Sequence, residues 1–217
     1  MKTINLGQSN SILNRFIAEL RDKSIQKDSM RFRRNLERIG EIFAYEISKT
    51  LNYSAKEVTT PLGIANCSIP DENMVLATIL RAGVPLHNGL LNIFDKAQNA
   101  FVAAYRKYGK DNKFTIQIEY ISSPSIEGKI LVIADSMLAT GSSLVLAYEK
   151  LCEKGEPAHT HIVCPIASEF SLGYLSKHLP HKKVTLWVAA VDEELTNKSF
   201  IVPGIGDAGD LAYGNKL

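Results

Sequence analysis

The segment ILVIADSMLATGSS, at residues 130–143, joins a buried-strand pattern to an acidic residue and then to a small, hydroxyl-rich turn. Four consecutive apolar residues, 130–133, are typical of a central parallel strand covered on both faces. Asp135 stands where this strand is predicted to end, and a helical pattern begins at Leu144. Hydroxyl groups and free backbone N–H groups would therefore meet at a helix N-terminus, which attracts anions. The segment predicts a phosphate site, although an ordinary helix N-cap can have the same residues.

The hydroxyl-rich turn is not a nucleotide-triphosphate loop. The pattern GxxxxGK[ST], in which a lysine contacts the phosphates, is absent from the chain.

Strand and helix patterns alternate along most of the chain. Residues 10–51 predict two packed helices from their apolar spacing. Apolar runs at 74–80, 130–134, 161–166 and 184–191 predict strands, and helical patterns follow at 85–94, at 144 to about 154 with Gly155 as its C-cap, and at 169–178. This order predicts an α/β fold with a mostly parallel central sheet, flanking helices and right-handed crossovers.

Two hairpins are predicted beside this sheet. Residues 57–69 mix β-branched residues with turn formers and predict a hairpin near a sheet edge, limited by Pro61 and Pro70. A short strand at 100–105, a polar stretch and an alternating segment at 114–121 predict a projecting antiparallel hairpin over about residues 106–124.

Length and composition favour one globular domain over residues 1–217. The formal charge of +2 is too small to indicate nucleic-acid or membrane binding. The start MKTINLGQSN lacks a secretory signal and no apolar run reaches the length of a membrane span, so we expect a cytoplasmic protein. Cys67, Cys152 and Cys164 are odd in number and lack CxxC spacing, which predicts buried thiols rather than disulfides or a zinc site.

Three further groups of residues have plain structural interpretations. His159 and His161 have no acid or cysteine nearby to complete a metal site, so we expect water-exposed histidines at a strand start. Tyr105 and Trp187 are expected in the core or at its margin. The basic cluster at Arg31, Arg33 and Arg34 is typical of a solvated helix face, with contact to a neighbouring subunit as the alternative.

Ligands of open α/β sheets bind beyond the carboxyl ends of the strands. Three predicted strands end at Arg81, Asp135 and Ile166, so candidate binding loops share one edge of the sheet. Two stretches at these strand ends, ILRAG (79–83) and ADSMLATGSS (134–143), and a later one, IVPGIGDAGD (201–210), resemble the uracil branch of the type I phosphoribosyltransferases, which use 5-phosphoribosyl-1-diphosphate (PRPP). RFRRNLERIGEIFAYE (31–46), TTPLGIA (59–65) and AYRK (104–107) resemble the same branch in the same order.

The resemblance implies a phosphoribosyltransferase type I fold whose projecting hairpin is a mobile flap. It also implies roles for individual residues. Arg81 would bind pyrophosphate, with Gly83 allowing close approach, Arg106 would be a second PRPP contact, and Asp135 would accept hydrogen bonds from ribose hydroxyls; these three charged residues are the expected catalytic groups. The full PRPP loop would be Asp135, Ser136, Met137, Leu138, Ala139, Thr140, Gly141, Ser142 and Ser143, of which 139–143 would hold the 5-phosphate.

The C-terminal segment (residues 200–210) would complete the site. Asp207 would contact PRPP, and Ile201, Gly206, Asp207 and Ala208 would bind uracil through main-chain groups. The implied reaction makes UMP and pyrophosphate from uracil and PRPP, with Mg²⁺ carried on the pyrophosphate, no direct protein ligand to the metal and no organic cofactor.

The resemblance further suggests a homodimer or tetramer. GTP activates some relatives, but no residue of this chain requires such an effector. Two alternatives remain: a phosphoribosyltransferase for another nucleobase, and a regulator that binds PRPP or UMP with little turnover. The chain differs from the usual family pattern in its flap and at Ser136, Ser142, Phe200 and Leu211.

Overall fold

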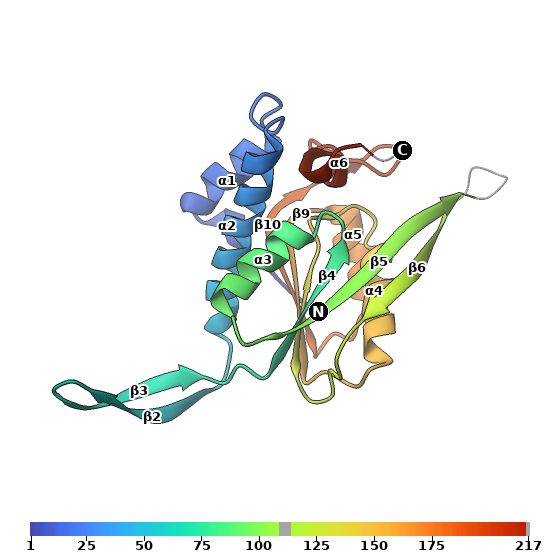
Figure 1. Ribbon diagram of the computed structural model, residues 1–217. Helices are drawn as coiled ribbons and strands as arrows, with labels where there is room; N and C mark the ends of the chain where they lie inside the picture. The colour runs from blue at the N-terminus through green and yellow to red at the C-terminus, as the bar shows by residue number, and fades with distance from the viewer. Residues whose placement is uncertain (109–113, 216–217) are drawn as a thin grey trace.

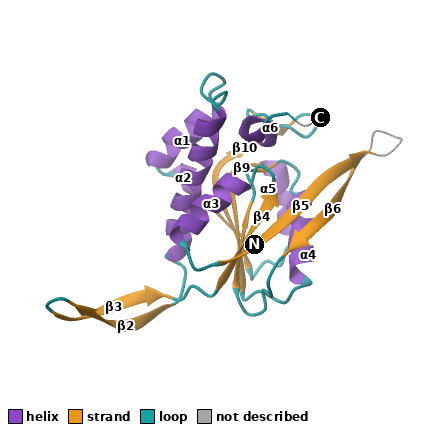
Figure 2. Cartoon of the chain, viewed as in Figure 1, coloured by secondary structure: helices purple, strands orange, loops and turns teal. Residues whose placement is uncertain are grey.

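Among the residues that the computed structural model describes, 1–108 and 114–215, an eight-stranded sheet forms the centre of the molecule (Figures 1 and 2). Side chains are described outside residues 105–117. The strand order is β1-β10-β9-β7-β4-β5-β6, with β8 paired to β9 off this path, and every pairing is parallel except β5 with β6. The strands are β1 (Lys2–Asn5), β4 (Met74–Leu80), β5 (Gln98–Tyr108), β6 (Phe114–Ser122), β7 (Ile130–Ala134), β8 (Met137–Leu138), β9 (His159–Ser168) and β10 (Val184–Asp192).

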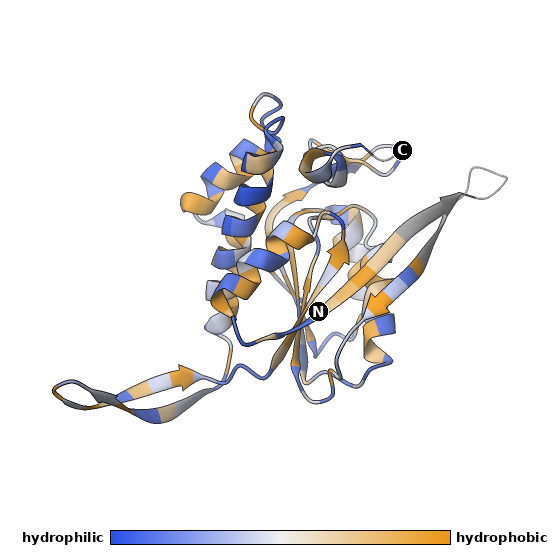
Figure 3. Cartoon of the chain, viewed as in Figure 1, coloured by the Kyte–Doolittle hydropathy of each residue, from blue (hydrophilic) through white to orange (hydrophobic). Residues whose placement is uncertain are grey.

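Strand β7 shows why the centre of the sheet is apolar on both faces. Its alternate side chains enter two different cores: Leu131 and Ile133 pack on one side, and Val132 and Ala134 on the other. All four are fully buried. Figure 3 accordingly shows hydrophobic colouring along the central strands. The prediction of a mostly parallel sheet flanked by helices is confirmed.

The helices cover the two faces in separate groups (Figure 1). The core on one side contains side chains of α1 (Ile12–Arg21), α2 (Ser29–Ser48) and α3 (Val84–Ile93), and the core on the other side contains those of α4 (Ser142–Cys152) and α5 (Glu169–His178). Side-chain caps start several of them: Ser11 accepts a hydrogen bond from the Leu13 N–H, and Asp28 accepts one from the Arg31 N–H. None of the described helices is long and apolar enough to cross a bilayer.

The first predicted hairpin forms, but not at the edge of the central sheet. Strands β2 (Tyr53–Thr60) and β3 (Gly63–Pro70) make a separate two-stranded sheet that projects from the body (Figure 1). Pro61 lies in its turn rather than at its limit. The edge next to β10 is instead occupied by β1, a strand that the sequence did not predict.

The second hairpin is antiparallel, as predicted. Strand β5 runs from Gln98 to Tyr108 and pairs with β6, and an irregularity in register falls between Ala103 and Ala104. Figure 1 shows both strands extending beyond the sheet. The tip, 109–113, lies outside the described residues, and closure of this hairpin over a ligand remains a prediction.

The histidine expectation is wrong for His161. This side chain is only 4% exposed, and its Nδ1 accepts a hydrogen bond of 3.0 Å from the Trp187 indole. Burial lowers the pKa of His161 to about 3, and the neighbouring His159 adds to the effect. Trp187 is buried as predicted, whereas the Tyr105 side chain lies outside the described residues.

Two smaller expectations also need correction, and a third is confirmed in part. Only Cys164 is a fully buried thiol, since Cys67 and Cys152 are partly exposed. The C-cap of α4 is Glu153, and Gly155 follows two residues later with a φ of 133°. In the basic cluster of α2, Arg31 and Arg34 are exposed as predicted and also pair, with Glu19 at 3.2 Å and Glu37 at 2.7 Å, whereas Arg33 is partly buried and donates to the Ala212 carbonyl at 2.6 Å.

Candidate active site

Arg81 connects the turn after β4 to the C-terminal part of the chain. Its Nη2 forms an ion pair of 3.0 Å with Asp210 Oδ1, and its Nη1 donates to the Gly214 carbonyl at 3.2 Å. Its Nε is buried and has no hydrogen-bond partner among the described residues. A buried guanidinium donor without a partner is costly unless a ligand supplies the acceptor. The peptide bond that precedes Arg81 is cis.

Gly83 stands at a position where tight packing leaves no room for a side chain. Its φ of −69° suits any residue. A Cβ at this position would lie 2.5 Å from the Thr78 hydroxyl oxygen, 2.6 Å from the Ile79 carbonyl oxygen and 2.9 Å from the Ala134 carbonyl oxygen. The space that a Cβ would take is filled by the ends of β4 and β7, and close approach of the Gly83 backbone to pyrophosphate remains a prediction. The glycine lets these two strand ends and their turns come together.

Asp135 follows β7 directly. Thr78 and Ala134 are register partners, so the turns bearing Arg81 and Asp135 leave neighbouring strands at the same edge. The Asp135 N–H donates to the Val163 carbonyl at 3.1 Å. Burial raises the pKa of Asp135 to about 7, against the opposing effect of the Met137 and Ser136 N–H groups. Hydroxyl groups that donate hydrogen bonds to it, or a nearby cation, would favour its ionised form.

The rest of the PRPP loop is held by β9 and the start of α5. Met137 and Leu138 form β8 and pair with Ile166 and Ala167. The Ser168 hydroxyl donates to the Ala139 carbonyl at 2.5 Å. The loop is thus fixed at its middle, while its following residues lead into α4.

The end of the PRPP loop has a geometry that suits an anion. Gly141 has a φ of 79°, in the left-handed region, and a Cβ there would collide with Leu175. The Thr140 and Ser142 hydroxyls lie 2.7 Å apart. The Thr140 hydroxyl accepts a long hydrogen bond of 3.4 Å from the Ser142 N–H, but helix α4, which begins at Ser142, has no side-chain cap from its N-cap residue Gly141. Its first N–H groups and these hydroxyls can therefore serve as donors to a phosphate.

Two of the described α-helices lack a side-chain cap from their N-cap residue, and the others have one. Helices α1, α2, α5 and α6 (Ala208–Tyr213) each have one, whereas α3 and α4 have none. Both uncapped helices follow the turns that carry the predicted phosphate ligands. Their positive N-terminal ends add to the anion-binding character of this edge.

The C-terminal segment lies across this edge. Strand β12 (Ile201–Val202) pairs with β11 (Glu194–Leu195), and the Ile201 side chain is 4% exposed. Gly206 has a φ of 84°, and Ala208 is the first residue of α6. Gly209 and Asp210 adjoin Arg81, so the ion pair brings the predicted pyrophosphate and uracil residues together.

Asp207 has a structural role that the sequence interpretation missed. Its Oδ1 caps α6 by accepting hydrogen bonds from the Gly209 and Asp210 N–H groups at 2.9 and 3.1 Å. The S/T/D-then-helix pattern could have predicted this cap. A contact from Asp207 to PRPP would use the same exposed side chain, and it remains a prediction.

Two parts of the predicted site need separate mention. The Arg106 side chain, the predicted second PRPP contact, lies outside the described residues. Within residues 1–108 and 114–215 there is no cluster of three or more His, Cys, Asp or Glu side chains suited to a metal. Mg²⁺ usually retains waters and binds one or two carboxylates together with substrate phosphates, so Asp135 and the anion-binding turns are compatible with a metal ion that arrives with its phosphate ligand.

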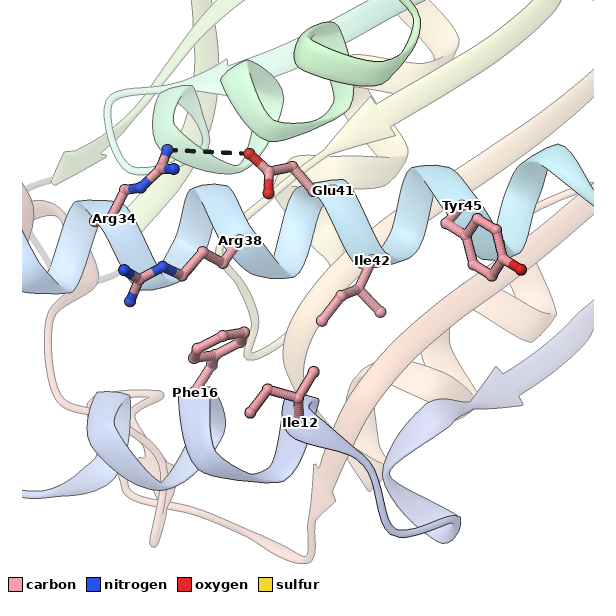
Figure 4. A pocket seen from close by; sticks show the side chains of 7 residues that line it. All are labelled: Ile12, Phe16, Arg34, Arg38, Glu41, Ile42 and Tyr45. Atoms are coloured by element: carbon pink, nitrogen blue, oxygen red, sulfur yellow. Dashed lines mark ion pairs between the residues drawn. The ribbon is translucent and has the colours of Figure 1, made fainter.

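A groove of about 380 Å³ lies away from this edge, between α1 and α2 (Figure 4). Arg34 and Glu41 approach each other at 3.9 Å on its rim. None of the predicted site residues lines it. The residues that do are Ile12, Phe16, Arg34, Arg38, Glu41, Ile42 and Tyr45.

The fold and the site define an α/β protein with turns and helix N-termini suited to an anion where the parallel strands end. Comparison with known proteins agrees. A family model described as uracil phosphoribosyltransferase matches residues 8–215. The chain is 56% identical over 217 residues to "Uracil phosphoribosyltransferase" of Porphyromonas gingivalis, covering 100% of both chains. It is 37% identical over 204 residues to the protein of the same name from Pyrococcus furiosus, covering 93% of this chain and 85% of that one.

A solved structure extends the similarity to the whole fold. The AQ2163 protein from Aquifex aeolicus superposes with a TM-score of 0.86 at 30% sequence identity, covering 98% of each chain. The chain belongs to the uracil phosphoribosyltransferase family.

Proposed function

We propose that this protein transfers the 5-phosphoribosyl group from PRPP to uracil and releases UMP and pyrophosphate. Family membership supports the substrates. The observation that carries the proposal on the structural side is the ion pair between Arg81 and Asp210. It brings the turn expected to bind pyrophosphate against the segment expected to bind uracil, which is the arrangement that transfer between two bound substrates requires.

In this proposal the phosphates are held at the carboxyl edge of the sheet. The PRPP loop and the uncapped N-terminus of α4 receive the 5-phosphate. Arg81 and the start of α3 receive the pyrophosphate, because a guanidinium offers paired donors to phosphate oxygens. Asp135 accepts hydrogen bonds from the ribose hydroxyls. Arg106 is proposed as a second PRPP contact from the hairpin.

Bond cleavage in such a transfer develops positive charge on the ribose ring while pyrophosphate leaves. The protein has to align uracil with the ribose carbon and stabilise the departing charge, so positioning and electrostatics dominate over nucleophilic catalysis. Mg²⁺ would be held by the pyrophosphate of PRPP and would neutralise part of the charge on the leaving group. The β5–β6 hairpin is proposed to exclude water from the closed site.

Uracil is proposed to be read by main-chain groups of Ile201, Gly206, Asp207 and Ala208. The pairing edge of uracil presents an acceptor, a donor and an acceptor, and fixed backbone groups cannot exchange their roles. Cytosine would place two mismatched groups against them, at a cost of about 1–3 kcal/mol each. We therefore expect kcat/KM for cytosine to be lower by at least about a hundredfold.

Pyrophosphate release, measured with Mg²⁺, PRPP and each base in turn, tests the proposal. Uracil and 5-fluorouracil should be turned over, because Phe200 changes the apolar wall and not the pairing edge. Comparable turnover of cytosine or hypoxanthine would favour a phosphoribosyltransferase for another base. Tight binding of PRPP or UMP without pyrophosphate release would favour a regulatory protein.

Four further properties belong to this proposal. We propose that residues 1–217 fold as a single domain, that the protein is cytoplasmic, and that it forms a homodimer or tetramer, which light scattering after size exclusion would measure. GTP is proposed only as a possible effector. Initial rates with and without GTP, at fixed PRPP and uracil, decide this point.

A further inference from the structure

Arg21 and Asp192 form a paired contact between the end of α1 and the end of β10. Arg21 Nη2 lies 2.7 Å from Asp192 Oδ1, and Arg21 Nη1 lies 2.8 Å from Asp192 Oδ2. The Asp192 side chain is 7% exposed and that of Arg21 is 25% exposed. The two hydrogen bonds are the bidentate geometry that fixes both side chains relative to each other.

Both members of this pair also bind the backbone of one residue in the C-terminal segment. The Gly204 N–H donates to Asp192 Oδ2 at 2.9 Å, and the Gly204 carbonyl accepts from Arg21 Nη1 at 3.0 Å. The donor and the acceptor of Gly204 are therefore both satisfied by one ion pair. We call these three residues the Gly204 clamp.

Because Gly204 is held in place, the neighbouring residues Ile201 and Gly206 are held as well. Its φ is 55°, and a Cβ there would collide with the Ile201 carbonyl, so the glycine is folded back against Ile201. Two residues later, Gly206 begins the other part of the expected uracil contact. The neighbouring α1–α2 connection adds a further tie, because the Gln26 side chain donates to the Ile205 carbonyl at 3.4 Å.

We propose that Arg21 and Asp192 are positioning residues for base recognition. The clamp sets the backbone groups of Ile201 and Gly206 to Ala208 in the register that reads the base, and it touches no substrate itself. This inference rests on the proposed function, since it takes the C-terminal segment as the base site. PRPP is expected to be held mainly by the turns after β4 and β7, and Asp207 is its one expected contact in this segment, so the clamp acts on the affinity for the base more than on the affinity for PRPP.

The test compares Arg21→Gln and Asp192→Asn with Arg15→Gln. Arg15 lies on the same helix, is 62% exposed and contacts only Glu19 at 4.0 Å among acidic side chains in the described chain, so it is a matched control for loss of one positive charge. KM for uracil should rise about tenfold or more in the two clamp variants, since loosened donors and acceptors lose both contact and alignment. KM for PRPP should stay within about twofold, and the control should resemble the wild type.

Three further measurements test whether the clamp acts on the base. The double variant should raise KM for uracil by about as much as either single variant, because each partner acts through the other. Discrimination against cytosine should fall in parallel. Arg21→Lys keeps the positive charge but loses the paired guanidinium donors, and it should show an intermediate KM for uracil. It also replaces Arg21→Gln as the test variant if the neutral variant fails to fold. Unchanged KM for uracil, or equal rises in KM for uracil and for PRPP, would overturn the clamp as a base-positioning device.

Failure of the proposed function gives a different result. If the wild-type protein turns over another base, the changes in KM for that base and for PRPP are compared in the same variants. The clamp proposal is then judged on that comparison. If the wild-type protein binds but does not turn over, the dissociation constants for uracil, UMP and PRPP replace the KM values. A selective loss of base affinity would support the clamp even though the transferase assignment had failed.

Discussion

Arg81 and Asp210, which are 129 positions apart in the sequence, form a direct ion pair of 3.0 Å at the candidate site. Their side chains are 35% and 33% exposed, and ion pairs that are this accessible contribute about 0–1 kcal/mol to stability. A phosphate group could therefore replace the carboxylate as the partner of Arg81 at small cost. The contact orders the arginine without holding it away from a ligand.

Arg81→Ala should remove most of the activity and leave the fold intact. The substitution deletes charge-assisted hydrogen bonds to pyrophosphate, each worth about 1.5–3 kcal/mol, so kcat/KM for PRPP should fall by at least about tenfold. Steady-state kinetics measure this. Asp210→Asn is the control, since it removes the ion pair but keeps the guanidinium, and it should cost far less. A change below about threefold in the alanine variant would contradict the assignment.

Asp135 should make PRPP binding depend on pH. Its pKa is raised to about 7, so the carboxylate that accepts from ribose hydroxyls is lost as the pH falls through that value. Titration of Mg²⁺-PRPP should show affinity increasing between about pH 6 and 8 in the wild type. Asp135→Asn should bind more weakly at pH 8 and show only the pH dependence of the ligand phosphates. An unchanged dissociation constant in this variant would be incompatible with the proposed role.

The same substitution should have the opposite effect on stability. Because the pKa is raised in the folded state, Asp135 favours folding most at pH values below the unfolded pKa, and this contribution is lost as the pH rises towards about 7. Asp135→Asn should therefore unfold at a higher temperature than the wild type at pH 8, in the absence of ligand. Burial of the Asp135 carboxyl costs stability but is expected to help bind the ribose. Asp135→Asn should therefore be less active and more stable than the wild type.

Gly141→Ala should destabilise the protein and weaken PRPP binding. The left-handed φ of 79° costs a non-glycine residue about 1–2 kcal/mol, and the collision with Leu175 adds to it. Gly173→Ala is the matched control, because a Cβ at that helical position meets no atom within 4 Å. The control should gain about 0.5–1 kcal/mol from helix propensity. Chemical denaturation of both variants measures the difference.

His161 should make the protein sensitive to acid. Burial keeps its folded-state pKa near 3, well below the usual value, so the unfolded chain binds a proton that the folded one does not. Stability should fall as the pH drops below about 6.5, by at most about 1.4 kcal/mol per pH unit. His161→Asn should have a flatter profile, although it loses the bond to Trp187. An equal slope in both proteins would show that other groups dominate.

The sheet was largely predictable because its central strands carry long apolar runs. Strand β7 and helix α5 have the predicted bounds. Strand β1 was missed because it is a four-residue, half-exposed edge strand without alternation, and β8, β11 and β12 have only two residues each. Such short strands depend on pairing partners that the local sequence does not reveal.

The turns that carry the candidate site residues could be predicted from the sequence. The contacts that hold the C-terminal segment in place could not. Motif residues such as Asp135 follow buried strands and could be placed by that rule. Asp192 ends a strand in the same way, so the rule could have identified it, but its partner Arg21 lies 171 positions away with no local signal. The packing role of Gly83 was not predicted, because contact with Thr78 and Ala134 leaves the same signal in the sequence as close approach to a ligand.

The pairing of Thr78 with Ala134 has a consequence for how the protein opens. Strands β4 and β7 are buried in the centre of the sheet, so their amides should exchange with solvent only on near-global unfolding. The C-terminal segment is tied to the body mainly by side-chain contacts such as that of Arg21 with Gly204, and its amides should exchange through smaller, local openings. On gradual denaturation the protein should therefore lose its selectivity among bases while it still retains the fold that binds PRPP.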